Sequence, residues 1–283
     1  MARGRSEKVL SRRYDGDSLR RTPDEVVVEE PMAIHLDDTL VATTMRTPGH
    51  DFELAVGFCH TEGLLGGAPV ESCRYCATGS AVETGFNVVS VDTGGRAPEP
   101  TPRLGPATSS CGLCGTADLD EVMVRLDPIP TTAVPPLEVC LAAPDRLHRA
   151  QGLFDTTGSV HAAAAFDAAG ELLVVREDIG RHNAVDKVVG RLLLDARLPA
   201  AGLGLVVSGR ASFEMVQKAW AAGFGVLVSV SGPSSLAVEA AQRAGLVLLA
   251  FARDGHGTLY APTDGDPFAL AAKVANESIE AAG

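Results

Sequence analysis

Short apolar segments alternate with amphipathic helical segments in the second half of the chain, and this alternation constrains the fold more than any other feature. The predicted strands are Gly204–Val207, Val226–Val230 and Leu246–Phe251, and the predicted helices are Asn183–Leu194, Phe213–Ala222 and Leu236–Ala244. Strands that are apolar on both faces need cover on both faces, which helices between parallel strands provide. The sequence therefore predicts an α/β domain with a mostly parallel sheet, over residues 137–283.

The first part of this domain has a different pattern. A helix from Leu137 through Leu147 leads into two more predicted strands, Val160–Phe166 and Leu172–Glu177. Upstream, residues 24–136 are predicted to form a smaller β-rich domain. The segments from which we predict it are an antiparallel pair (Glu25–Glu30 and Met32–Thr44, with a turn at Asp37-Asp38), a helix over Phe52–Leu65 capped by Asp51, and a strand over Val82–Val91.

Charge and hydropathy exclude several classes of function. The 283 residues carry a formal net charge of −12, and residues 1–21 hold seven of the Lys and Arg side chains but three acidic ones. A broad nucleic-acid surface is therefore not expected, and residues 1–23 are predicted to be a flexible basic tail. No apolar run is long enough to span a membrane and the N-terminus lacks the apolar core of a secretory signal, so we expect a cytoplasmic protein.

A pair of thiols in Ser110-Cys111-Gly112-Leu113-Cys114-Gly115 is the strongest chemical signal. The glycines leave the sulfur atoms without side-chain cover, so a thiolate there can approach a reaction partner closely. The segment suits the exchange of sulfur. The alternative is a structural zinc site, because Cys73 and Cys76 form a second C-x-x-C pair.

Four turns that follow predicted strands carry glycine, hydroxyl or basic residues. They are Asp178–Asn183, Ser208–Ser212, Ser231–Ser235 and Phe251–Gly257. Backbone N–H groups at helix N-termini attract anions, and α/β sheets bind ligands at the carboxyl edge of their strands. We expect a phosphate-bearing ligand there, with Arg181, Arg210 and Arg253 as contacts; simple capping by Ser212 and Ser234 is the alternative. His182 is read as a capping or hydrogen-bonding residue, not as a proton-transfer group.

Together these motifs resemble one known family. The motifs are C-G-L-C-G, D-I-G-R-H-N-A-V-D-K from Asp178, S-G-R-A-S-F-E-M-V-Q-K from Ser208 and S-S-L-A-V-E from Ser234. In this order they are similar to the FdhD family, the sulfur carrier proteins required for formate dehydrogenase activity, over about residues 24–261. The resemblance implies a larger domain with the cytidine deaminase fold, and a homodimer.

The resemblance also implies an activity. The protein would take persulfide sulfur from a cysteine desulfurase and pass it to the molybdenum bis(molybdopterin guanine dinucleotide) cofactor of formate dehydrogenase. Cys111 would carry the persulfide, with Cys114 assisting. The stretch Phe251, Ala252, Arg253, Asp254, Gly255 and His256 would bind the cofactor, although the charge of Asp254 repels phosphate. The cofactor would be a bound acceptor, and no permanent cofactor is expected.

Three rival interpretations come from the cysteines. A zinc hydrolase of the deaminase type would use His60, Glu62 and the Cys111/Cys114 pair, but Ser110 stands where that signature has proline. A chaperone of apo-formate dehydrogenase would use the cysteines only for a structural metal. A thioredoxin-like oxidoreductase would place its C-x-x-C on a strand-to-helix turn, which this segment does not occupy.

Overall fold

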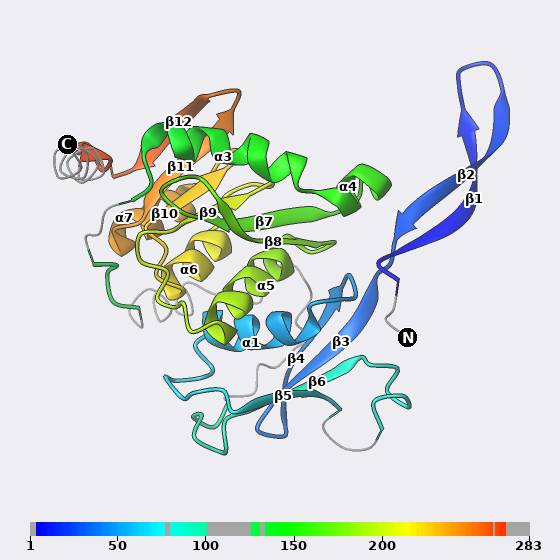
Figure 1. Cartoon of the computed structure of the whole chain (residues 1–283), viewed down its shortest axis with the longest axis horizontal. Helices are drawn as coiled ribbons and strands as arrows, with labels where there is room; N and C mark the ends of the chain where they lie inside the picture. The colour runs from blue at the N-terminus through cyan, green and yellow to red at the C-terminus, as the bar shows by residue number, and fades with distance from the viewer. Residues whose placement is uncertain (1–3, 77–79, 101–125, 131–133, 263, 270–283) are drawn as a thin grey trace, which may run out of the picture.

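A six-stranded sheet and the helices around it form the larger part of the molecule (Figure 1). The structure is a computed structural model, and it describes residues 4–76, 80–100, 126–130, 134–262 and 264–269. The strand order of the sheet is β12-β11-β10-β9-β7-β8. The strands are β7 (His161–Phe166), β8 (Leu172–Asp178), β9 (Gly204–Val207), β10 (Val226–Ser229), β11 (Val247–Arg253) and β12 (His256–Ala261).

The sheet is mixed, so the prediction of a mostly parallel sheet was wrong in part. β9, β10 and β11 are mutually parallel, whereas β7 is antiparallel to both β8 and β9, and β12 is antiparallel to β11. β8 therefore runs in the same direction as β9, β10 and β11. The carboxyl ends of these four strands share one edge of the sheet with the start of β7.

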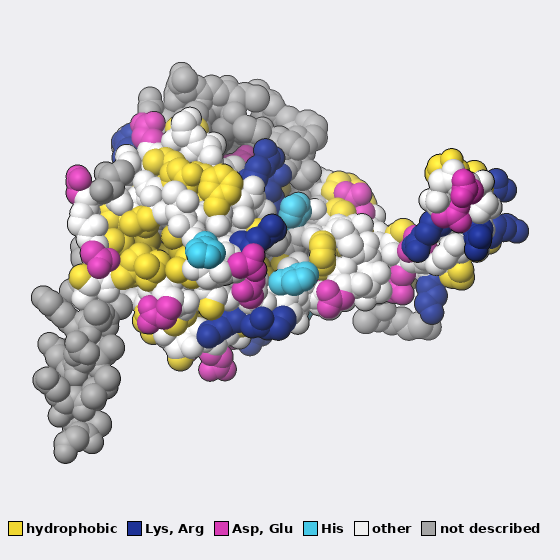
Figure 2. Space-filling model, turned by 90° about the horizontal axis from the view of Figure 1, so that it is seen from above, with side chains coloured by type: hydrophobic (Ala, Val, Ile, Leu, Met, Phe, Trp, Pro, Cys, Tyr) yellow, Lys and Arg dark blue, Asp and Glu magenta, His cyan; other side chains and the backbone are white. Residues whose placement is uncertain are grey.

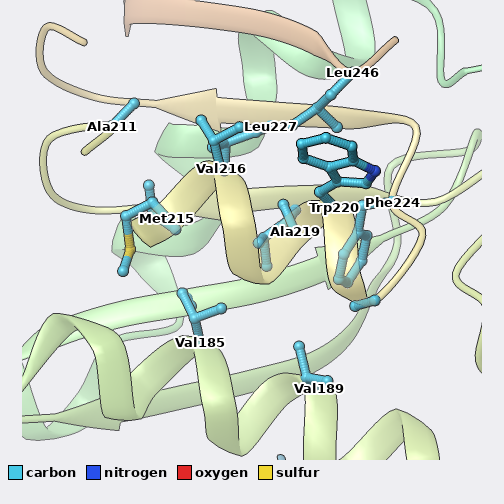
Figure 3. Close-up of a cluster of buried hydrophobic side chains, with 14 of the residues drawn as sticks. Val185, Val189, Ala211, Met215, Val216, Ala219, Trp220, Phe224, Leu227 and Leu246 are labelled. Atoms are coloured by element: carbon cyan, nitrogen blue, oxygen red, sulfur yellow. The ribbon is translucent and has the colours of Figure 1, made fainter. Parts of the chain in front are cut away.

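Helices cover both faces of this sheet, as predicted. On one face, α5 (Arg181–Leu194), α6 (Phe213–Ala221) and α7 (Ser235–Ala244) bury a core that includes Val185, Met215 and Trp220 (Figure 3). On the other, α3 (Leu137–Arg149) packs its Cys140, Ala143 and Leu147 side chains against the strands. A short helix, α4 (Gly152–Thr157), connects α3 to β7.

A second, four-stranded sheet belongs to the N-terminal part and has the order β4-β3-β6-β5. Its strands are β3 (Glu30–Leu36), β4 (Thr39–Arg46), β5 (Ser72–Tyr75) and β6 (Val88–Asp92). The predicted turn at Asp37-Asp38 is confirmed, and both residues have positive φ (45° and 67°). The strand predicted over Val82–Val91 was too long, because turns occupy residues 81–86.

The helix α1 (Asp51–Thr61) lies between the four-stranded sheet and α5, which covers the six-stranded sheet. His50, in the left-handed conformation, is its N-cap, so the predicted cap at Asp51 was wrong; the Asp51 carboxylate instead binds the buried Arg46 guanidinium at 3.1 Å. α1 crosses α5 at two glycines. A Cβ on Gly57 would lie 1.8 Å from the carbonyl oxygen of Asp186, and one on Gly190 would lie 1.8 Å from that of Glu53. The helices therefore meet backbone to backbone.

The N-terminal residues form a β-ribbon, so the prediction of a flexible tail over residues 1–23 was wrong for this part. β1 (Ser6–Tyr14) pairs with β2 (Leu19–Val27) along the full length of both strands, and the ribbon projects from the body (Figure 1). The division into domains at residues 136 and 137 stays a prediction. No helix in the described ranges is long and apolar enough to cross a membrane.

Candidate functional site

A cavity of about 840 Å³ lies at the edge where the four strands end. The cavity is lined by Ile179 after β8, Ser208 after β9 and Val230 after β10, and by the end of β11 (Ala252 and Arg253) with the following Asp254. The opposite wall comes from α3, α4 and the start of β7, with Asp145, His148, Gln151, Phe154, Gly158 and His161 among its residues. His, basic and acidic side chains gather on the face of the molecule seen in Figure 2.

Hydrogen bonds hold the strand-end turns of this edge in place. The Ser208 hydroxyl accepts from the backbone N–H of Ala162 at 2.9 Å, which ties the end of β9 to the start of β7. The turns after β9 and β10 touch at an isolated bridge between Ala211 and Pro233. The Ser234 side chain caps α7 by accepting from the N–H of Ala237, as the capping interpretation predicts, whereas Ser212 makes no such bond to its helix. Two adjacent helix N-termini therefore lie close to the cavity edge.

His161 is the imidazole at the start of β7, and it lines the cavity. Burial lowers its pKa, and the neighbouring Arg181 and His182 lower it further, so this ring is neutral at neutral pH. Arg181 Nε is buried and makes no hydrogen bond within the described part of the chain. A buried donor without an acceptor is costly, so this guanidinium is suited to an incoming anion.

Asp178 and His182 make no hydrogen bond or ion pair with each other. His182 Nε2 lies 2.6 Å from a Glu214 carboxylate oxygen, and this hydrogen bond lowers the pKa of Glu214. Asp178 is fully buried and binds Lys187 Nζ at 2.7 Å. It also accepts from three N–H donors, those of Thr47, Gly180 and the Asn183 amide.

The Lys187 and Asp178 pair connects the two sheets beside the cavity. Lys187 Nζ donates to the carbonyl oxygen of Thr47 at 2.9 Å, and the Thr47 hydroxyl accepts from the N–H of Ile179 at 3.0 Å. Ile179 is a cavity residue. The loop after β4 therefore sets the position of the turn after β8.

The predicted binding residues lie at different depths relative to the cavity. Within the stretch from Phe251 to His256, the cavity is lined by Ala252, Arg253 and Asp254. Phe251 has a φ of 51° and packs over Gly232, where a Cβ would lie 2.7 Å from its ring. Gly255 and His256 are exposed beyond the cavity, and so is Arg210. Their roles stay predictions.

The predicted sulfur residues Cys111 and Cys114 lie outside the described residues. Among the described cysteines, burial raises the pKa of Cys73 and of Cys140 to about 12, so neither thiol ionises at neutral pH. His60 Nε2 lies 3.1 Å from the carbonyl oxygen of Ala221. That nitrogen is therefore a hydrogen-bond donor and not a zinc ligand. Within the described ranges, no group of three or more His, Cys, Asp or Glu side chains is placed to hold a metal ion.

Sequence reasoning missed the residues on the α3, α4 and β7 side of the cavity, chiefly His148, Phe154 and His161. In a wholly parallel sheet, the start of β7 would lie at the opposite edge. Its antiparallel direction brings His161 to the carboxyl ends of the other strands. The short connection between Val160–Phe166 and Leu172–Glu177 was the available signal, because antiparallel neighbours need only a tight turn.

Comparisons with known proteins agree on one family. The model of the FdhD/NarQ family matches residues 27–265. The sulfur carrier protein FdhD of Mycolicibacterium paratuberculosis is 47% identical over 88% of this chain and 94% of its own length. That of Streptomyces avermitilis is 47% identical over 92% and 95%. A putative formate dehydrogenase accessory protein from Desulfotalea psychrophila has a similar fold, with a TM-score of 0.75 over 92% of this chain and 98% of its own, at 24% identity.

Proposed function

Because the chain belongs to the FdhD/NarQ family, we propose that it is a sulfur carrier and sulfurtransferase that serves formate dehydrogenase. In this proposal a cysteine desulfurase donates persulfide sulfur to Cys111. The acceptor is the molybdenum bis(molybdopterin guanine dinucleotide) cofactor, bound as a substrate. The protein acts in the cytoplasm as a homodimer.

The cavity at the carboxyl edge is the observation that carries this proposal. It is large enough for a nucleotide-sized part of the acceptor, and Arg253, His148, His161 and Ser208 line it. Arg181, with its unpartnered Nε, lies close enough to His161 to lower the pKa of that imidazole. Asp145 and Asp254 also line the cavity, and these carboxylates would disfavour phosphate beside them, so we place the phosphates on the Arg181, Ser208 and Arg253 side.

The first chemical step is a thiol exchange. The Cys111 thiolate attacks the terminal sulfur of the donor's persulfide, the S–S bond of the donor breaks, and the donor cysteine leaves as a thiolate. The product is a Cys111 persulfide. In the second step, the Cys114 thiolate attacks the inner sulfur of that persulfide, so that a Cys111–Cys114 disulfide forms and the terminal sulfur leaves as hydrosulfide for the acceptor. A cellular thiol then reduces the disulfide.

Two alternatives use the same residues differently. In a zinc hydrolase of the cytidine deaminase type, His60 would be a metal ligand through Nδ1, because its Nε2 donates to the carbonyl oxygen of Ala221. The likeness of the larger domain to the cytidine deaminase fold stays a prediction. A chaperone without sulfur transfer would bind apo-formate dehydrogenase and leave Cys111 unmodified.

The test is intact-protein mass spectrometry after incubation with a cysteine desulfurase and cysteine. We expect a gain of about one sulfur mass that maps to Cys111 and is removed by reductant. Cys111→Ala should abolish the gain. Cys140→Ala is the matched control, because the Cys140 thiol is buried and its pKa is about 12. Stoichiometric zinc without a gain of sulfur would refute the proposal and support a metal site.

A further inference from the structure

The ribbon formed by β1 and β2 has an unusual surface for a segment exposed to water. Tyr14 and Leu19 are opposite each other, and they are 67% and 62% exposed. Leu10, opposite Pro23, is 60% exposed. An isolated two-stranded ribbon is only marginally stable in water, and exposed aromatic and aliphatic side chains on it gain nothing from the solvent.

Arginines lie between these apolar pairs. Arg12 is opposite Arg21, on the same ribbon face as the Tyr14/Leu19 and Leu10/Pro23 pairs, because side chains two residues apart along a strand share a face. We call this the Tyr14 face. Like charges in directly opposite positions destabilise a strand pair. Within the described residues neither arginine makes an ion pair, so the two charges are available to a partner.

The other face of the ribbon provides a natural comparison. Its cross-strand pairs are Arg13/Arg20, Ser11/Thr22 and Val9/Asp24. Arg20 already has an acidic neighbour, since its Nε lies 3.5 Å from an Asp15 carboxylate oxygen. This face therefore has the same number of arginines, but it lacks the exposed apolar pairs beside them.

The base of the ribbon is joined to the wall of the cavity. The Arg5 guanidinium donates to the carbonyl oxygen of Glu177 at 3.1 Å. The Glu177 carboxylate accepts from the N–H groups of Leu153 and Phe154, at 3.0 and 2.8 Å, which fixes the start of α4. β2 packs on α4, and Phe154 lines the cavity. A protein held by the ribbon would thus lie beside the cavity.

We propose that the Tyr14 face binds the protein that receives the contents of the cavity, through a surface of that protein on which carboxylates lie between apolar side chains. Tyr and Arg are the residue types enriched at the energetic centre of protein interfaces, and opposite charges fix register. The inference rests on the proposed function, which makes apo-formate dehydrogenase the receiving protein. Nucleic acid is disfavoured because a phosphate backbone offers no apolar surface for Tyr14, Leu19 and Leu10.

The experiment compares two double variants of the full chain for binding to immobilised apo-formate dehydrogenase from the same host. Arg12→Glu/Arg21→Glu should weaken binding by about tenfold or more. Arg13→Glu/Arg20→Glu, which makes the same change of charge on the same two strands, should change the affinity by less than about twofold. Leu19→Ser should weaken binding without changing its dependence on salt. Binding of guanosine diphosphate to the cavity should stay unchanged in all three, which shows that the body is folded.

Three results would overturn this inference. In the first, the wild type binds and the two double variants either both keep its affinity or both lose it to the same extent. This result would leave the proposed function intact. The second is a wild-type dimer in light scattering that Arg12→Glu/Arg21→Glu alone converts to monomer, which would make a second copy of this chain the occupant. The third is no binding by the wild type, which would remove formate dehydrogenase as the partner and the proposed function with it.

Discussion

Removal of the Lys187 ammonium tests the buried ion pair between the two sheets. Lys187 and Asp178 both have 0% exposure, and their charged atoms are 2.7 Å apart. In Lys187→Met, the Asp178 carboxylate would stay buried without its counter-charge. Loss of one partner of a buried pair typically costs about 3–5 kcal/mol. Because the Asp178 carboxylate keeps its three N–H donors, we expect the lower end, about 3 kcal/mol.

The assay is urea unfolding of the full chain, followed by the fluorescence of Trp220. This is the one tryptophan of the sequence, and it lies on the buried face of α6 with 5% exposure. Asp178→Asn/Lys187→Met removes the uncompensated charge as well, so it should recover about 1–2 kcal/mol relative to Lys187→Met. Lys8→Met, on the exposed ribbon, is the control and should change stability by less than about 0.5 kcal/mol. A double variant no more stable than Lys187→Met would refute the reasoning, and so would a loss below about 1 kcal/mol in the single variant.

Three further predictions concern other parts of the molecule. Burial opposes ionisation of Glu53, but hydrogen bonds from Arg176 and His50 lower its pKa from 4.5 to about 2, so the stabilisation it gives above pH 4.5 should be lost as the pH falls toward 2. Thermal unfolding of Glu53→Gln should show a smaller pH dependence over that range, and an unchanged dependence would contradict the assignment. Gly57→Ala should destabilise the chain by about 3 kcal/mol or more in urea unfolding, since its Cβ would meet the carbonyl oxygen of Asp186, whereas Gly152→Ala, with open space around it, should not. Arg253→Ala should weaken the binding of guanosine diphosphate about 10- to 100-fold by calorimetry, whereas Arg149→Ala, outside the cavity lining, should leave it unchanged; equal effects would remove Arg253 from the site.

The order of strands and helices after residue 160 could be predicted from the sequence because each apolar segment has few alternatives. The predicted strand Gly204–Val207 agrees with β9, and the predicted helix Phe213–Ala222 differs from α6 by one residue. The direction of β7 could not be predicted from its apolar pattern, because a run of alanines such as Ala162–Ala165 fits parallel and antiparallel neighbours alike. That one direction decides whether His161 lies in the cavity.

The N-terminal ribbon escaped prediction for a related reason. Val9 to Tyr14 contains three polar or charged residues, and the polar periodicity of a ribbon exposed on both faces resembles that of a flexible segment. Its pairing depends on the turn at Asp15, whose carboxylate accepts from the N–H groups of Asp17 and Ser18. Among the site residues, Arg253 could be predicted from its place after an apolar strand. Phe154 could not, because its place at the cavity depends on the Glu177 carboxylate, which accepts hydrogen bonds from the N–H groups at the start of α4.

The backbone contact between α1 and α5 at Gly57 and Gly190 limits how this molecule can work. A rotation of the small sheet relative to the large one would push the backbones of the two helices into each other. In the opposite direction, it would expose the buried cluster of Lys218, Asp186 and Thr61. The two sheets therefore form one rigid unit. Sulfur that passes between distant points of this unit must be carried by chain segments or by the partner proteins themselves, and not by a hinge motion between the sheets.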